Sequence, residues 1–237
     1  MFYFLVPGLM AYNVILIIAA VIPAVILLFT VYKSDKLEKE SGSLLWKLIV
    51  SGVISALIAL VLERVFSLPL MLVEDPLAYN IILYFIIVAF SEEGAKYLML
   101  YLRTWKNPEF NCQFDGVVYA VFVSLGFAIW ENISYVLHYG FTTALVRAVT
   151  AIPGHASFAV FMGIFYGIAR RAAAEGKASK KKLFQILAVI IPALVHGTYD
   201  FIASTASSIW IFIIFIVIMF VIAFVLVRTN SKKDSYF

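Results

Sequence analysis

The sequence predicts an all-α fold, a polytopic bundle of about seven transmembrane helices with a polar site in the bilayer core. Of the 237 residues, 64% are hydrophobic and 14% are charged, whereas a soluble domain carries about 25% charged residues. The charges lie in short clusters between apolar stretches of roughly 20 residues or more, each long enough to cross a bilayer. These stretches are continuous and do not alternate with polar residues, which favours helices over a β-barrel.

Seven spans are expected, at residues 8–32, 44–62, 77–102, 114–137, 143–169, 183–203 and 206–227. The first has no basic residues before it and its lysines follow it, so we expect a retained span and not a cleaved signal peptide. A short turn rich in Ser and Thr, at residues 204–208, joins the last two spans. No internal repeat or separate soluble segment is visible, so residues 1–237 are expected to form one membrane domain.

The basic residues predict the orientation of the chain. With the N-terminus outside and the C-terminus inside, fifteen of the eighteen Lys and Arg residues fall on the cytoplasmic side, as the positive-inside rule expects. These fifteen are Lys33, Lys36, Lys39, Lys47, Arg103, Lys106, Arg170, Arg171, Lys177, Lys180, Lys181, Lys182, Arg228, Lys232 and Lys233. The outer loops hold only Arg64. The net charge of +4 therefore reflects membrane topology, and we expect a multi-pass protein of the cell membrane with no nucleic-acid partner.

Polar residues inside the spans are the functional candidates, because a charged side chain at mid-bilayer costs about 2.5–3.5 kcal/mol on insertion scales. They are Glu92, Glu93 and Lys96 in the third span, Glu131 and Asn132 in the fourth, Arg147 and His155 in the fifth, and His196 and Asp200 in the sixth. At about 1.5 Å per residue, Glu92, His155 and His196 lie roughly 16 to 22 Å from the cytoplasmic ends of their spans, so we expect them in one layer. On the same count Glu131 lies about 26 Å from the cytoplasmic end of its span, closer to the outer face.

Helical spacing pairs several of these side chains. Lys96 lies four residues after Glu92 and shares its helix face, where its ammonium can offset the buried carboxylate. Asp200 has the same relation to His196. Arg147 lies near the outer end of its span and is expected to extend to the interface.

Prolines precede both histidines closely. Pro153 lies two residues before His155, and Pro192 lies one turn before His196. Each proline removes a backbone hydrogen bond, and irregular backbone at membrane depth is tolerated where it lines a cavity, so we expect both histidines to face a hydrated pocket. Further along the fifth span, the Gly-x-x-x-Gly spacing of residues 163–167 predicts close helix packing.

Two chemical schemes fit this set. Glu92, His155 and His196 can form a three-ligand zinc site with an open position, where zinc would lower the pKa of water to about 7, and Glu93 would be the general base. Without metal, Glu92 and His155 would activate water, while His196 and Asp200 stabilise the oxyanion. Both schemes hydrolyse a peptide bond, and the residues alone leave the choice open.

Other readings compete with hydrolysis. Buried Glu, His and Asp residues also build ion-coupled transporters and proton pathways, and a non-catalytic scaffold would retain them for structure alone. Glu131 and Asn132 are equally compatible with bridging two helices. Cys112, in a loop on the cytoplasmic side, is expected to be an ordinary reduced thiol. Asp115 is expected to be a helix-terminal charge or a lid on the pocket.

Four motifs in order, between residues 85 and 203, resemble the PrsW family of bacterial membrane proteases. They are Glu92-Glu93-Gly94-Ala95-Lys96, Phe127-Ala128-Ile129-Trp130-Glu131-Asn132, Gly154-His155 and His196-Gly197-Thr198-Tyr199-Asp200. That family is related to the CAAX-processing and bacteriocin-processing membrane proteases, in which the basic residue is Arg and lies four residues after the second glutamate. Here Lys96 lies three residues after it, which favours the PrsW branch over a CAAX-type prenyl-protein endopeptidase.

The resemblance implies a membrane-embedded endopeptidase, with metal dependence more expected than a metal-free glutamate mechanism. It implies that the catalytic or metal-binding set is Glu92, Glu93, His155 and His196, with Asp200 supporting. We expect further support from Lys96, Glu131 and Asn132. The resemblance also implies a substrate: a single-pass membrane protein such as an anti-sigma factor, of which the enzyme makes the first cut. The surrounding membrane lipid is the other expected partner.

Overall fold

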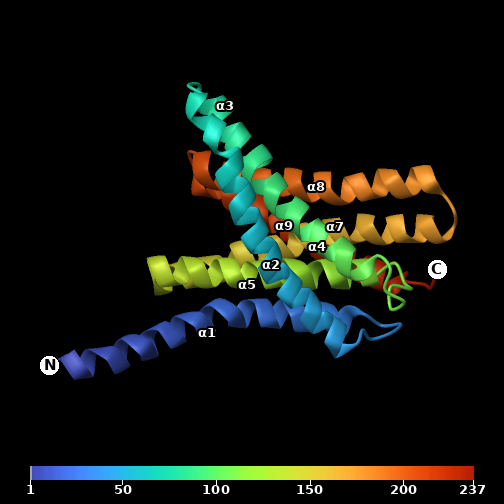
Figure 1. The fold of residues 1–237 in the computed structure, drawn as a ribbon, viewed down its shortest axis with the longest axis horizontal. Helices are drawn as coiled ribbons and strands as arrows, with labels where there is room; N and C mark the ends of the chain where they lie inside the picture. Colours follow the sequence, from blue (N-terminus) through green and yellow to red (C-terminus); the bar gives the residue numbers. More distant parts are fainter. Residues whose placement is uncertain (1) are drawn as a thin grey trace.

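The computed structural model describes the backbone of residues 2–237 and the side chains of residues 10–237. Within this part, seven helices are long and apolar enough to cross a membrane, which confirms the predicted helical bundle. The described residues form no strand beyond an isolated bridge between Cys112 and Tyr236. Figure 1 shows the two ends of the chain at opposite ends of the bundle, as an odd number of spans requires.

Each expected span corresponds to one helix or to a run of short ones. Five are single helices: α1 (Phe2–Ser34), α2 (Gly42–Phe66), α5 (Asp115–Tyr139), α8 (Ala178–Thr205) and α9 (Ile209–Lys232). The third span consists of α3 (Pro76–Ile81), the π-helix η2 (Ile82–Ala89) and α4 (Phe90–Thr104). The fifth consists of α6 (Phe141–Val149) and α7 (Ala151–Ala174). A 3-10 turn, η1 (Leu68–Leu72), follows α2.

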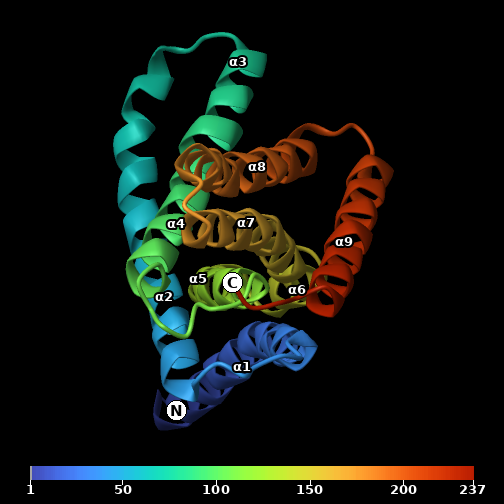
Figure 2. The same ribbon diagram turned by 90° about the vertical axis from the view of Figure 1, so that its right-hand side faces the viewer.

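Helices α8, α7, α5 and α1 are stacked in that order (Figure 2), with α2 and α4 on one side of the stack and α9 on the other. The central helix is α5, in which every residue from Asp115 to Ala128 is buried. A helix that is buried all round lies inside a bundle and not at its lipid-facing surface. The first half of α5 is therefore enclosed by the other helices, and Glu131 lies beyond this fully buried stretch.

The Gly-x-x-x-Gly spacing brings α7 against α5. A Cβ atom on Gly163 would lie 2.4 Å from the Cα atom of Val117, and one on Gly167 would lie 2.1 Å from the carbonyl oxygen of Gln113. Both distances are shorter than any side chain allows, so the two backbones touch only because these positions are glycines. The predicted close packing is confirmed.

A π-helix directly precedes the Glu92-Glu93 pair. The sequence predicted one regular helix over residues 77–102, but α3 and then η2 occupy its first half, and α4 begins only at Phe90. On one side η2 packs on α8, where a Cβ atom on Gly197 would lie 2.6 Å from the ring of Phe85. Wide π-helical turns are rare and occur frequently at functional sites. Here the π-helix ends at the residue before the turn that carries both glutamates.

The fifth span bends where two helices meet, at Thr150, whose φ and ψ are −120° and −72°. The sequence predicted irregular backbone at the prolines near both histidines, but the structure has it elsewhere. Pro153 lies in the first turn of α7, where a missing N–H costs no helical hydrogen bond, and the Gly154 amide donates to the Thr150 carbonyl at 2.9 Å. Helix α8 continues through Pro192. The break lies before Pro153, and none occurs at Pro192.

Candidate active site

A cavity of about 870 Å³ opens between α2, α4, α5, α7 and α8. Five of the predicted site residues line it: Glu92, Glu131, His155, His196 and Asp200. They belong to four different helices, α4, α5, α7 and α8. The structure thus brings together polar residues that are far apart in the sequence.

Three of these side chains converge most closely. Glu92, His155 and His196 each place one possible ligand atom within 4.8 Å of the other two, and all three residues are buried. A carboxylate and two imidazoles are a donor set that suits zinc and leaves a position open. This trio is the one that the sequence predicted for a metal.

Lys96 lies behind the trio and is fully buried. Its Nζ atom donates to Glu92 at 3.1 Å and to Glu93 at 2.7 Å, and it lies 3.2 Å from Nδ1 of His155. The ammonium also lies 3.9 Å from the ring centroid of Phe127. Lys96 therefore offsets both adjacent carboxylates, as the four-residue spacing from Glu92 indicated.

Glu93 does not reach the cavity. Its side chain is fully buried, and its Oε1 atom lies 2.7 Å from Lys96 and 3.0 Å from Nδ1 of His196. With no cavity-facing atom, Glu93 is badly placed to take a proton from a substrate-side water. The general-base role that the sequence analysis gave to Glu93 stays a prediction, and the position of its side chain favours holding His196 instead.

Each ring nitrogen of His196 faces a carboxylate. Glu93 lies 3.0 Å from Nδ1, and Asp200 lies 3.3 Å from Nε2. A neutral imidazole carries one N–H and can donate to only one of them. The other nitrogen then faces a carboxylate, which is favourable only when a proton or a cation lies between the two. Metal-binding histidines commonly donate their second nitrogen to a carboxylate, so this arrangement fits a metal ligand. The ring of Phe158 stacks on His196 at 4.5 Å and fixes its plane.

His155 is held on both sides as well. Its Nε2 atom lies 2.8 Å from Oε2 of Glu131, and Lys96 faces its Nδ1 atom. With Nε2–H donated to Glu131, Nδ1 is the nitrogen that can bind a metal, in exchange for the contact with Lys96. The trio thus fits a metal site in which each histidine keeps a carboxylate on its outer nitrogen.

Glu131 belongs to the site, although counting residues placed it nearer the outer face. That count ended the fifth span at residue 169, whereas α7 continues to Ala174, so His155 lies farther from that end of its helix than expected. The Glu131 carboxylate therefore reaches the ring of His155, 2.8 Å away.

Arg147 is a site residue that the sequence analysis assigned to the interface. Its NH2 group lies 2.9 Å from Glu131, and its Nε atom donates to the Asn132 side chain at 2.8 Å. Asn132 in turn donates to the backbone carbonyl of Ala20 at 2.9 Å. Asn132 therefore joins α5 to α1 and α6 and does not line the cavity. The sequence does offer one signal for Arg147. Glu131 and Asn132 are adjacent hydrogen-bond acceptors inside a span, and such a pair needs a donor nearby.

Glu63 of α2 is a second residue that the sequence analysis did not select. It lines the same cavity as the histidines, together with Tyr84 and Tyr199. Its position near the end of the second span made it look like an ordinary interfacial charge. No local spacing links Glu63 to the four motifs, so only the crossing of α2 over the stack reveals it.

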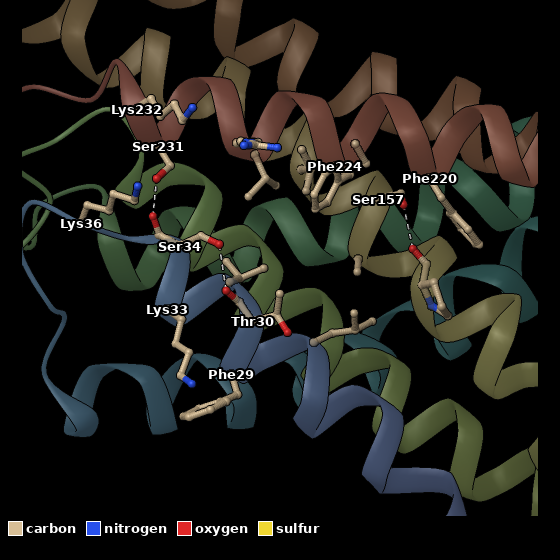
Figure 3. Close-up of a pocket in the computed structure, with 18 residues that line it drawn as sticks. Phe29, Thr30, Lys33, Ser34, Lys36, Ser157, Phe220, Phe224, Ser231 and Lys232 are labelled. Atoms are coloured by element: carbon tan, nitrogen blue, oxygen red, sulfur yellow. Dashed lines mark hydrogen bonds between the residues drawn. The ribbon is translucent and has the colours of Figure 1, made fainter.

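A separate groove of about 740 Å³ lies on another face of α7, between α1 and α9. Figure 3 shows basic residues, among them Lys36 and Lys232, at one end of this groove and the rings of Phe220 and Phe224 along it. None of the predicted site residues lines it. The candidate chemistry therefore belongs to the cavity on the opposite side of α7.

Comparison with known proteins shows the family of the chain. The model of the PrsW family of intramembrane metalloproteases matches residues 40–227. A protein named Protease PrsW from Shouchella clausii is 32% identical over 94% of this chain and 98% of its own length. Its namesake from Bacillus subtilis is 33% identical over 83% of this chain and 86% of its own length. No solved structure matches the chain. The chain therefore belongs to the PrsW family of intramembrane metalloproteases.

Proposed function

We propose that this protein is a zinc-dependent endopeptidase that cuts a single-pass membrane protein within or beside the bilayer. The observation that carries the proposal is the convergence of Glu92, His155 and His196, from three helices, on one cavity. Membership of a family of proteases favours peptide hydrolysis over transport and over a scaffold role. The family description also favours the metal-dependent scheme over the metal-free one.

Glu92, His155 and His196 would hold the zinc ion. Bound there, zinc supplies Lewis-acid chemistry, polarising a peptide carbonyl and making a nearby water molecule more acidic. The protein's own contribution is to keep the two imidazoles in a fixed orientation. Glu131 orients His155 at 2.8 Å, and Glu93 orients His196 at 3.0 Å.

Asp200 is the best-placed group to accept a proton from the attacking water. Two carboxylates outside the metal-binding trio contact its histidines and line the cavity, Glu131 and Asp200, with side chains 23% and 22% exposed. Glu131 is already committed to His155 and Arg147. Asp200 contacts only His196, at 3.3 Å, and keeps an oxygen free to accept a proton.

The position of the cavity supports a substrate that is itself a membrane protein. The cavity lies among helices that cross the membrane, so a peptide bond reaches it most directly from a chain that is itself in the membrane. The resemblance to PrsW proteases favours an anti-sigma factor, whose first cut would begin the release of its sigma factor.

The test is cleavage of tagged, single-pass anti-sigma factors in proteoliposomes that contain the purified chain. We expect Glu92→Gln and His196→Ala to lower the cleavage rate by at least about 100-fold, the usual scale for losing an essential acid, base or ligand. Asp200→Asn should lower the rate while zinc stays bound. Ser134→Ala is the matched control, because Ser134 lines the same cavity but donates only to the Trp130 carbonyl. Full cleavage by Glu92→Gln would contradict the proposal, and uptake of a labelled solute without any cleavage would favour transport.

A further inference from the structure

Three buried carboxylates meet at the end of the bundle that the charge pattern assigns to the cytoplasm. Asp35 and Glu40 lie in the connection between α1 and α2, and Asp115 begins α5. Each offers an oxygen within 4.8 Å of the other two, and their exposed fractions are only 2%, 6% and 2%. Asp115 lies sixteen residues before Glu131 on α5, about 24 Å along the helix at 1.5 Å per residue. The cluster is therefore separate from the active-site cavity.

The charge of this cluster is only partly offset, since Lys39 lies near Asp35 but donates no hydrogen bond to its carboxylate. Neither carboxylate oxygen of Asp35 has a hydrogen-bond partner among the described residues. The nearest ammonium, that of Lys39, donates to the backbone carbonyls of Tyr32 and Asp35 and not to a carboxylate. Burying unpaired charges of one sign costs several kcal/mol each. Either protons or a bound cation must then neutralise them, and three oxygens within 4.8 Å of one another can hold a cation.

A phenol lies next to the cluster. The hydroxyl of Tyr119 is fully buried beside the carboxylate of Glu40, but no hydrogen bond of standard geometry joins the two. Asp115 is partly satisfied, because one of its oxygens accepts the backbone N–H groups of Asn111 at 3.0 Å and Cys112 at 2.6 Å. These two bonds confirm the expected helix-terminal role of Asp115, away from the catalytic cavity. Its neighbours Asp35 and Glu40 remain without a positive partner.

We propose that Asp35, Glu40 and Asp115 bind one hard divalent cation, Mg²⁺ or Ca²⁺. Carboxylate oxygens are the ligands that these ions prefer, and water completes their coordination. The ion would tie the α1–α2 connection to the start of α5. Other contacts converge on the same region: the Phe114 amide donates to Asp234 at 2.9 Å, and Ser231 of α9 donates to the carbonyl of Ser34 (Figure 3). The bound cation thus acts as a structural clamp at the cytoplasmic end of the bundle.

Manganese binding tests the proposal, because Mn²⁺ replaces Mg²⁺ and is counted by electron paramagnetic resonance. The experiment uses the full chain in detergent with His196→Ala, which removes the proposed catalytic metal. We expect about one Mn²⁺ per chain, displaced by millimolar Mg²⁺ or Ca²⁺, and none when Asp35→Asn is added. Glu38→Gln is the matched control, since Glu38 lies in the same connection but pairs with Asn111 and Tyr236. The chain with both His196→Ala and Glu38→Gln should bind as much Mn²⁺ as the chain with His196→Ala alone.

Thermal unfolding gives a second, independent readout and shows whether each variant folds. Mg²⁺ or Ca²⁺ added to EDTA-treated, desalted protein should raise the Tm by about 5 °C, the scale expected at about 100 times Kd for a chain of this length. Asp35→Asn and Glu40→Gln should lose this response, and without cation their Tm should equal or exceed that of the wild type, because a repelling charge is gone. Two results would overturn the proposal: absence of Mn²⁺ from the His196→Ala chain, or binding that survives Asp35→Asn but is lost in Cys112→Ser. The second result would place the ion in the adjacent set of Cys112, Asp115 and Asp234.

Discussion

The Nε2 atom of His155 lies 2.8 Å from the carboxylate of Glu131, and the same oxygen lies 2.9 Å from Arg147. This chain of contacts joins α7, α5 and α6 across the bend at Thr150. Because Arg147 neutralises the carboxylate from one side, Glu131 can hold the imidazole from the other. The orientation of His155, one of the proposed metal-binding histidines, therefore depends on Arg147, a residue outside the four sequence motifs.

Replacing Glu131 with Gln should lower proteolytic activity by about 10- to 100-fold, the usual cost of losing a carboxylate that orients a metal-binding histidine. The amide keeps the shape of the side chain but no longer favours the His155 tautomer that donates from Nε2. The measurement is kcat/KM for a cleaved substrate, with zinc content determined on the same samples. Unchanged kcat/KM would show that Glu131 does not orient His155.

Lys96→Met should destabilise the fold by about 3–5 kcal/mol, because it leaves Glu92 and Glu93 buried without their ammonium. Thermal unfolding in detergent measures this. Adding Glu93→Gln to Lys96→Met should recover part of the loss, since one unpaired charge is then removed. If the double variant is no more stable than Lys96→Met, the charge explanation is wrong.

The contact between α2 and α5 should not tolerate a single methyl group. A Cβ atom on Gly126 would lie 2.2 Å from the carbonyl oxygen of Ile49, so Gly126→Ala must push the two helices apart. Nothing lies within 4 Å of a Cβ atom on Gly94, which is also helical. Gly94→Ala is therefore the control and should raise stability by about 0.5–1 kcal/mol, whereas Gly126→Ala should lower the Tm clearly. Equal effects of both substitutions on the Tm would argue against this packing.

The acidic cluster should make stability depend on pH when divalent cations are absent. Burial, with smaller contributions from neighbouring carboxylates, raises the pKa of Glu40 from 4.5 to about 8. Between these two values the folded chain binds more protons than the unfolded chain, so the free energy of unfolding falls as the pH rises. The Tm in EDTA should therefore be higher at pH 5.5 than at pH 8, and Glu40→Gln should reduce the difference. A Tm that rises over this range in both proteins would contradict the sign.

Local spacing predicted the parts of the site that lie within one helix. The contact of Lys96 with Glu92 follows from a four-residue separation, as does that of His196 with Asp200. Arg147 was not predicted as a site residue because its partner Glu131 lies on another helix, and contacts between helices cannot be read from hydropathy. The seven spans were predictable from apolar length alone.

The π-helix η2 and the cluster around Asp35 were not predictable for a related reason. The π-helix packs on α8 through the contact of Phe85 with Gly197, which lie more than a hundred positions apart. Asp35 and Asp115 looked like ordinary charges at helix ends, and only the packing of α1, α2 and α5 buries them together. Contacts of this kind depend on helix packing, which leaves no periodic signal in the sequence.

Zinc content of the purified chain, measured by elemental mass spectrometry, tests the catalytic assignment most directly. Every protein in this experiment should also carry Asp35→Asn, so that the cluster of Asp35, Glu40 and Asp115 binds no metal. We predict about one zinc per chain, retained in Ser134→Ala and lost in His196→Ala and in Glu92→Ala. Stoichiometric zinc in the His196→Ala chain, or full proteolytic activity in a chain without metal, would contradict the assignment of Glu92, His155 and His196 as the catalytic metal site.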